Sequence, residues 1–157
     1  MSNFKYDLIE AQAEENKVAD ILRSYNYNVT TTQDLLQFSG YDLVAVDNKT
    51  GLEFTFEIKQ DKKAEKSYNV AIEISKKVDG ISYRSGLSAT KASHTIYSIG
   101  GKYYSILTRK LKDLLKDLKK DDNLTVVWGG DRSSAKIVLL PLIHFKRNAK
   151  ELRINNE

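Results

Sequence analysis

The segment 41–60 constrains the fold of this chain most strongly. Residues 41–47 are almost continuously apolar behind one acid, which is typical of a central β-strand. The tetrad Asn-Lys-Thr-Gly at 48–51 has the chemistry of a turn, and residues 52–60 then alternate between apolar and polar types. These features predict an antiparallel hairpin in which Glu57 and Lys59 lie on one face of the second strand.

The remaining pattern predicts an α/β protein with a single domain over residues 1–157. Apolar residues recur at helical spacing over 7–25 and 109–120. Strands are predicted at 27–31, 67–75, 95–99, 103–107, 124–128 and 136–145, with a Gly-Gly hairpin signal at 100–101. The stretch 79–93 is rich in Gly, Ser and Thr, and the tail 146–157 is polar. The apolar segment 137–145 is a candidate for the core or for a dimer interface.

Composition excludes several kinds of protein and site. A hydrophobic fraction of 41% argues against a disordered chain, and 29% charged residues argue against a membrane protein. The absence of cysteine excludes disulfides, thiolate zinc sites and iron–sulfur clusters, and two widely separated histidines argue against a histidine-built zinc site. Any metal therefore needs oxygen ligands. Because the first residues lack the apolar core of a secretory signal, we expect a cytoplasmic protein.

Charge is unevenly distributed along the chain. Residues 1–57 contain 4 basic and 10 acidic residues, a balance of −6, whereas residues 58–157 carry +10, which sums to the overall net charge of +4. This division suits a metal-dependent enzyme acting on a polyanion, with carboxylates for cations and ammonium groups for phosphates. Scattered lysines that only keep the domain soluble explain the charge equally simply.

Four residues stand out as candidates for chemistry. Glu14 continues the apolar stripe of the first helix, so it either needs a partner in the interior or forms a salt bridge at its rim. Asp42 and Glu57 are 57 − 42 = 15 residues apart, which lets them meet at one end of the hairpin. Adjacent carboxylates repel unless a cation joins them, and their oxygens select Mg²⁺ or Mn²⁺. With Lys59 beside them, phosphodiester hydrolysis is one interpretation, and an ordinary solvated hairpin is the other.

The order of Glu14, Asp42, Glu57 and Lys59 over residues 7–99 resembles the PD-(D/E)xK nuclease superfamily. Tyr41 replaces the proline that usually precedes the aspartate. The resemblance implies a restriction-endonuclease-like core, in which a mixed central sheet is flanked by helices. It also implies Mg²⁺ as the cofactor, for which Mn²⁺ can substitute, ligated by Asp42, Glu57 and the carbonyl of Ile58. All four residues would be catalytic, and Gln60 is a further candidate contact.

Within the superfamily, the chain is most similar to the small Holliday-junction resolvases of archaeal and bacteriophage type. The early helix glutamate and the segment Ser85-Gly-Leu-Ser-Ala-Thr-Lys-Ala carry this similarity. It implies a homodimer that cuts four-way DNA junctions and leaves 5′-phosphates. The cytoplasm in which we expect it to act could be that of a phage-infected host cell. The candidate DNA-binding residues are Lys62, Lys63, Arg84, Ser85 and Lys91.

Two alternatives stay open at this stage. One is another DNA nuclease of the same superfamily, such as a restriction-type enzyme or a recombination exonuclease. The other is a DNA-binding domain that has the fold but no catalytic activity.

Overall fold

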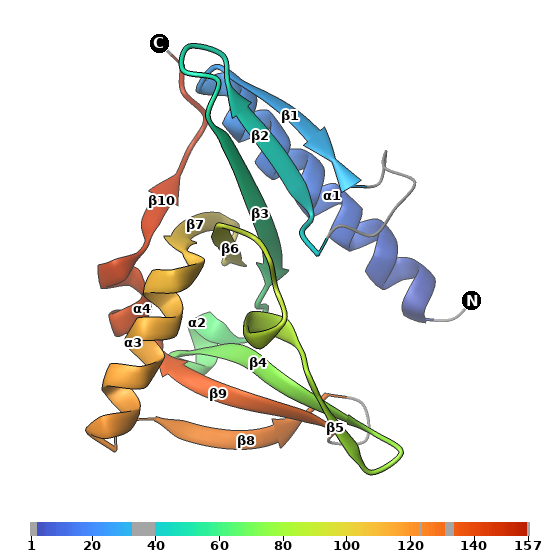
Figure 1. Ribbon diagram of the computed structural model, residues 1–157, viewed down its shortest axis with the longest axis vertical. Helices are drawn as coiled ribbons and strands as arrows, with labels where there is room; N and C mark the ends of the chain where they lie inside the picture. Colours follow the sequence, from blue (N-terminus) through green and yellow to red (C-terminus); the bar gives the residue numbers. More distant parts are fainter. Residues whose placement is uncertain (1–2, 33–39, 123, 131–133, 157) are drawn as a thin grey trace.

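The structure, a computed structural model, describes residues 3–32, 40–122, 124–130 and 134–156. These residues form two β-sheets with helices packed against them (Figure 1). The elements in chain order are α1 (Asn3–Ser24), β1 (Tyr27–Thr31), β2 (Leu43–Asp47), β3 (Glu53–Gln60), α2 (Ala64–Ser67), β4 (Asn69–Val78), β5 (Ile81–Arg84), the 3₁₀ helix η2 (Gly86–Ser88), β6 (His94–Ile99), β7 (Lys102–Leu107), α3 (Thr108–Lys120), β8 (Thr125–Gly129), β9 (Ala135–Pro141), α4 (Leu142–Asn148) and β10 (Lys150–Leu152).

The larger sheet has six strands in the order β1-β2-β3-β6-β7-β10. Strands β3 and β6 run parallel, and all other neighbours in this sheet run antiparallel. The predicted α/β class with a mixed sheet flanked by helices is therefore confirmed. The predicted hairpin is β2 and β3, in which Leu43 lies opposite Phe56 and Val46 lies opposite Glu53.

Hydrophobic clusters cover both faces of the six-stranded sheet. One cluster joins the C-terminal half of α1 to β1, β2 and β3, and the other joins β6 and β7 to α3, α4 and the second sheet. Adjacent residues of β6 show the division, because Ile96 belongs to the first cluster and Tyr97 to the second. Successive side chains of a strand point to opposite faces, so this sheet is the central layer of the protein.

The second sheet has four antiparallel strands in the order β5-β4-β9-β8. Strands β4 and β5 form a hairpin whose turn residues, Asp79 and Gly80, have φ of 50° and 78°. Positive φ at both positions is the backbone that a tight hairpin turn needs. Of these two strands, β4 was predicted from the sequence and β5 was missed. All four residues of β5 are exposed, although Ile81 and Tyr83 alternate with Ser82 and Arg84.

The predicted strand over 136–145 is wrong in its last third. Strand β9 ends at Pro141, and α4 begins at Leu142. Leu142 and Phe145 are buried while Ile143 between them is 56% exposed, which is the three-residue spacing of a helix face. The polar tail also contains β10, which pairs with β7. As the partner of β4 and β8, β9 contributes Val138 and Leu140 to the core, whereas the interface role considered for this segment stays a prediction.

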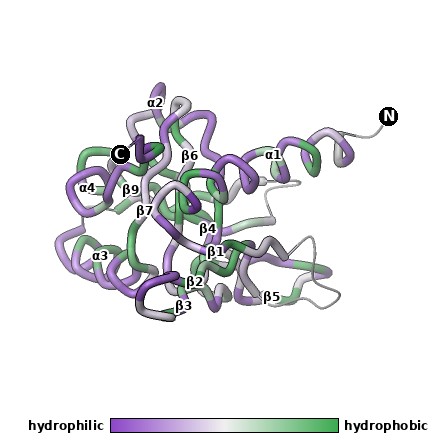
Figure 2. The backbone as a smooth tube through the Cα atoms, turned by 90° about the horizontal axis from the view of Figure 1, so that it is seen from above, coloured by the Kyte–Doolittle hydropathy of each residue, from purple (hydrophilic) through white to green (hydrophobic). Residues whose placement is uncertain are grey.

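Helix α1 buries only part of its length. Val18 and Leu22 lie in the core, whereas Tyr6 and Ile9 are 57% and 55% exposed. The N-terminal turns accordingly project beyond the sheets (Figure 2). None of the described helices combines the length and the apolar character that crossing a membrane requires.

Candidate active site

The β2–β3 hairpin brings Asp42 and Glu57 side by side. Leu43 is paired with Phe56, so the next position outward along the ladder pairs Asp42 with Glu57. The amide of Asp42 donates a hydrogen bond to the carbonyl of Phe56 at 2.8 Å. The amide of Ile58 donates to Oδ2 of Asp42 at 2.7 Å. The predicted meeting of the two acidic residues at one end of the hairpin is confirmed.

The backbone of Ile58 is directed toward the carboxylate of Asp42. In an extended strand, the N–H and the C=O of one residue point to the same neighbouring strand. Because the Ile58 amide is bonded to Asp42, its carbonyl faces the same side of β3. A carboxylate and a backbone carbonyl are thus gathered at the end of β2.

Lys59 forms an ion pair with Glu57 on one face of β3. Its Nζ lies 3.1 Å from Oε1 of Glu57, and the two side chains are 47% and 18% exposed. Burial alone would lower the pKa of Lys59, but attraction to Glu57, Asp42 and Glu73 outweighs this effect and raises the pKa. Lys59 is therefore protonated at neutral pH and acts as a hydrogen-bond donor and a positive charge.

Asp42 carries a negative charge that its surroundings compensate only in part. Burial raises its pKa first, and repulsion from Glu57 adds to this effect. The hydrogen bond from Ile58 and the charge of Lys59 oppose the rise, and the resulting pKa is about 6. A cation bound between Asp42 and Glu57 would relieve this repulsion.

Glu14 is a buried carboxylate on the sheet-facing side of α1. It is 9% exposed and accepts a hydrogen bond from the hydroxyl of Tyr103 on β7. The Nζ of Lys17 lies 3.9 Å from its other oxygen. Burial, followed by the hydrogen bond to Glu14, raises the pKa of Tyr103 above its ordinary value. Of the two roles left open for Glu14, the structure combines an interior partner, which is a tyrosine hydroxyl and not a cation, with a salt bridge to Lys17.

All four predicted catalytic residues line one cleft of about 380 Å³ between α1 and the end of β3. Six carboxylates and two lysines border this cleft. The lining residues are Asp7, Glu10, Ala11, Glu14, Glu15, Asp42, Glu57, Ile58, Lys59, Gln60 and Lys62. The excess of four negative charges makes the cleft attractive to cations.

Three acidic residues of this cleft were missed by the sequence reasoning, namely Asp7, Glu10 and Glu15. A signal for two of them was present, because Asp7, Glu10 and Glu14 follow one another at steps of three and four residues. Residues at this spacing share one face of a helix. The acidic face of this helix, considered beside its apolar stripe, would have identified Asp7 and Glu10.

The donor set at Asp42 fits a hard divalent cation such as Mg²⁺. Two carboxylates and the Ile58 carbonyl supply oxygen ligands, and Mg²⁺ usually takes one or two carboxylates while keeping waters and substrate phosphates. Within the described ranges, no group of three or more His, Cys, Asp or Glu side chains has the arrangement of a complete metal cage.

The predicted DNA-binding residues are dispersed, and only the first two lie at or next to the cleft. Lys62 lines it and forms an ion pair with Glu10 at 2.7 Å. Lys63 lines an adjoining cavity that also contains Lys59 and Gly86.

The other three predicted DNA-binding residues lie away from the catalytic cleft. Arg84 donates to the carbonyl of Ser88 and lines a separate groove together with lysines of α3. The hydroxyl oxygen of Ser85 is buried and has no hydrogen-bond partner among the described residues. Lys91 is exposed, and its backbone amide donates to the carbonyl of Gly40 at 3.2 Å.

No known protein family and no curated protein sequence matches the chain. The bacterial homing endonuclease I-Ssp6803I is similar in structure, with a TM-score of 0.45 and 14% sequence identity. The match covers 60% of this chain and 64% of that endonuclease, which is less than two thirds of its length.

Proposed function

We propose that this protein is a Mg²⁺-dependent DNA endonuclease that hydrolyses phosphodiester bonds. The observation that carries the proposal is the convergence of Glu14, Asp42, Glu57 and Lys59 on one acidic cleft. Glu14 comes from α1, Asp42 directly precedes β2, and Glu57 and Lys59 belong to β3. Catalytic residues must share one cleft. An ordinary solvated hairpin has no such requirement.

The chain's own residues supply binding, orientation and charge. Asp42, Glu57 and the carbonyl of Ile58 would hold the cation. Bound there, Mg²⁺ would polarise the scissile phosphate and increase the acidity of water. Because Lys59 is protonated, its ammonium group donates hydrogen bonds to the attacking water or to the phosphate oxygens and stabilises the charge that develops there. Glu14, held by Tyr103, closes the opposite wall of the cleft.

We further propose that the substrate is a four-way DNA junction and that the protein cuts it as a homodimer. A junction has two-fold symmetry and needs paired cuts, whereas one chain carries one such cleft among its described residues. Exposed apolar side chains are candidates for the dimer contact. The exposed apolar residues of α1, Tyr6, Leu8 and Ile9, are available for this contact.

A cleavage assay tests the two levels of the proposal separately. The purified protein is incubated with a four-way junction, the matched linear duplex and a single strand of the same sequence, each with and without Mg²⁺. Cleavage only with Mg²⁺ supports the nuclease, and preference for the junction supports the resolvase. Equal cutting of duplex and junction would overturn the junction preference. Salt-sensitive binding without cutting would indicate a DNA-binding domain.

A further inference from the structure

A second and larger cavity lies beside the first half of β3, whereas the catalytic cleft lies at the end of this strand. Its volume is about 600 Å³, within the range of about 300–1,000 Å³ that is typical of small-molecule sites. Phe54 and Phe56 line it, whereas Glu57 and Lys59 border the catalytic cleft. The two sites therefore lie toward opposite ends of β3 and share no lining residue. We call this space the aromatic cavity; its lining residues are Leu22, Tyr25, Tyr27, Phe54, Phe56, His94, Ser105, Ile106, Leu107, Lys110, Arg147, Asn148, Ala149, Lys150 and Leu152.

One end of the aromatic cavity is built from connected rings. The rings of Tyr27 and Phe54 meet edge to face with their centroids 6.1 Å apart, and Phe54 meets His94 in the same way at 5.6 Å. His94 in turn stacks on Phe56 with centroids 5.1 Å apart. Burial lowers the pKa of His94, so its ring is uncharged at neutral pH. These contacts hold the rings in place before any ligand enters.

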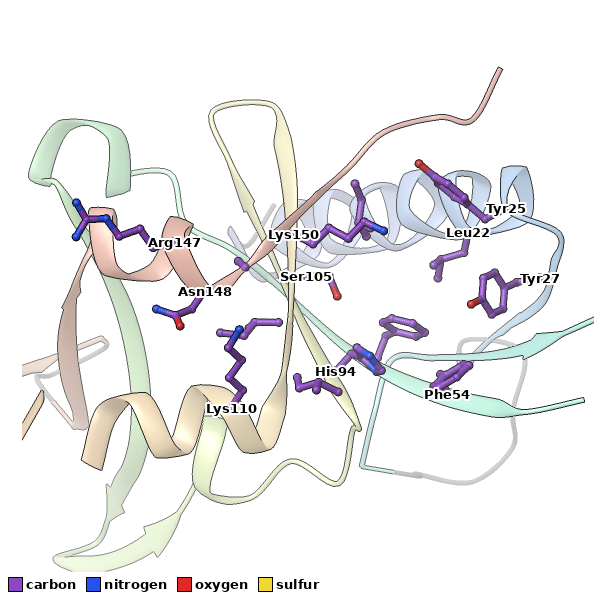
Figure 3. Close-up of a pocket in the computed structure, with 15 residues that line it drawn as sticks. Leu22, Tyr25, Tyr27, Phe54, His94, Ser105, Lys110, Arg147, Asn148 and Lys150 are labelled. Atoms are coloured by element: carbon purple, nitrogen blue, oxygen red, sulfur yellow. The ribbon is translucent and has the colours of Figure 1, made fainter. Parts of the chain in front are cut away.

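The other end of the aromatic cavity carries positive charge. Lys110 of α3, and Arg147 and Asn148 of α4, lie on the side of the cavity away from Tyr25, Tyr27 and Phe54, and the side chain of Arg147 extends outward from it (Figure 3). A third cation, Lys150, lies closer to Leu22 and Tyr25. No Asp or Glu lines the cavity. Lys110 and Arg147 have no ion pair with any residue in the described part of the chain. Their charges are therefore available to an anionic ligand.

We propose that the aromatic cavity binds one nucleotide, with its base among the aromatic rings and its phosphate near Lys110 and Arg147. Stacking on an aromatic side chain stabilises a bound base by about 1–3 kcal/mol and tolerates any sequence. Guanidinium and ammonium groups are the usual partners of phosphate oxygens. A purely apolar ligand would not contact the cations. A purely anionic ligand would not stack on the aromatic rings.

The nucleotide has two possible sources with the same chemistry. One is an unpaired nucleotide of the DNA substrate, which a branch point or an end provides. The other is a free nucleoside monophosphate. The DNA source rests on the proposed nuclease function, whereas the binding of a free nucleotide does not.

Binding is tested by NMR titration of the isotopically labelled full chain with deoxyadenosine monophosphate. We expect saturable shifts at the backbone amides of Ser105, Asn148 and Ala149, and an affinity at least about tenfold above that of deoxyadenosine or deoxyribose 5-phosphate alone. Absence of saturable shifts at these amides, or equal binding of the sugar phosphate, would overturn the proposal.

Variants separate the two ends of the cavity. The double substitution Lys110→Ala with Arg147→Ala should weaken binding of deoxyadenosine monophosphate by about tenfold or more. Tyr25→Ala removes a ring that is 41% exposed, so it should weaken binding without unfolding the protein. Lys120→Ala at the end of α3 is the matched control, because Lys120 does not line the aromatic cavity. Equal weakening by Lys120→Ala would show only a general effect of charge and would overturn the site.

The source is identified with two DNA hairpins, one fully paired and one with a single extrahelical nucleotide, titrated without Mg²⁺. Shifts of the cavity amides only with the extrahelical nucleotide would assign the site to the substrate. Shifts with the free monophosphate but with neither hairpin would assign it to a free nucleotide. Equal shifts with both hairpins would indicate contact with the DNA backbone and overturn the proposal. Because no step requires cleavage, an inactive protein that binds the monophosphate would refute only the nuclease.

Discussion

The backbone amide of Ile58 donates a hydrogen bond of 2.7 Å to Oδ2 of Asp42. This contact connects the residue that precedes β2 to β3. It lies next to Leu43 and Phe56, the terminal pair of opposite residues in the two strands. It fixes one carboxylate oxygen of Asp42, which borders the cleft together with Glu57. The raised pKa of Asp42 follows from this geometry, because the carboxyl group is buried and lies close to Glu57.

Asp42→Asn is expected to abolish Mg²⁺-dependent cleavage while the protein stays folded. The amide keeps an oxygen that can accept from Ile58 but loses the charge that attracts the cation. Mg²⁺ should raise the melting temperature of the unmodified protein, because a ligand that binds only the folded state stabilises it. Adding Mg²⁺ should not change the melting temperature of the Asp42→Asn variant. Asp20→Asn on the exposed side of α1 is the control, and full activity of Asp42→Asn would refute the site.

The pH dependence of stability should carry the signature of Asp42. Folding raises its pKa from the ordinary 3.8 to about 6, so the folded state binds this proton more tightly than the unfolded state does. Ionisation of Asp42 therefore reduces the free energy of unfolding as the pH rises from about 4 to about 6, by on the order of 1–3 kcal/mol. Denaturation in urea without Mg²⁺ should show Asp42→Asn gaining stability relative to the unmodified protein across this range. A constant difference would contradict the prediction.

Lys59→Ala is expected to reduce the cleavage rate by about a hundredfold or more, since a positioned donor in the transition state commonly contributes that much. DNA binding should change little, because the loss is one partly exposed charge. Binding is measured by fluorescence anisotropy in Ca²⁺ and cleavage in Mg²⁺. Lys49→Ala, in the exposed turn between β2 and β3, is the matched control. A rate near that of the unmodified protein would show that Lys59 has no catalytic part.

Tyr103→Phe should lower the free energy of unfolding by about 1–3 kcal/mol, because it leaves the buried carboxylate of Glu14 without its hydroxyl donor. Chemical denaturation measures this loss. Tyr6→Phe removes an exposed hydroxyl from α1 and should have no measurable effect. If Tyr103→Phe is as stable as the unmodified protein, the hydrogen bond does not hold Glu14.

Gly86→Ala should destabilise the protein by more than Gly101→Ala. Both glycines have positive φ, of 52° and 78°, so both substitutions strain the backbone by about 1–2 kcal/mol. A Cβ at Gly86 would lie 2.3 Å from the backbone oxygen of Glu73, whereas one at Gly101 meets nothing within 4 Å. The difference between the two variants in urea denaturation isolates this close approach. Equal losses would show that the 3₁₀ helix η2 can move away from β4.

The sequence by itself determined the local part of the site. Alternation along β3 placed Glu57 and Lys59 on one face, and the turn between β2 and β3 brought Asp42 to their level. These relationships need only the two-residue period of a strand and a short connection, which nearby residues encode. For the same reason the helices, and the strands with clear apolar alternation, could be predicted.

Only the tertiary structure decided which distant segments share a surface. Glu14 and Tyr103 are 89 residues apart, and no local period relates them. The second sheet, the helix after Pro141 and the strand β10 in the polar tail depend on pairing and burial that neighbouring residues do not encode. The aromatic cavity likewise draws on both ends of the chain. Local patterns state which face of an element is apolar, but burial against a particular partner is settled when the whole chain packs.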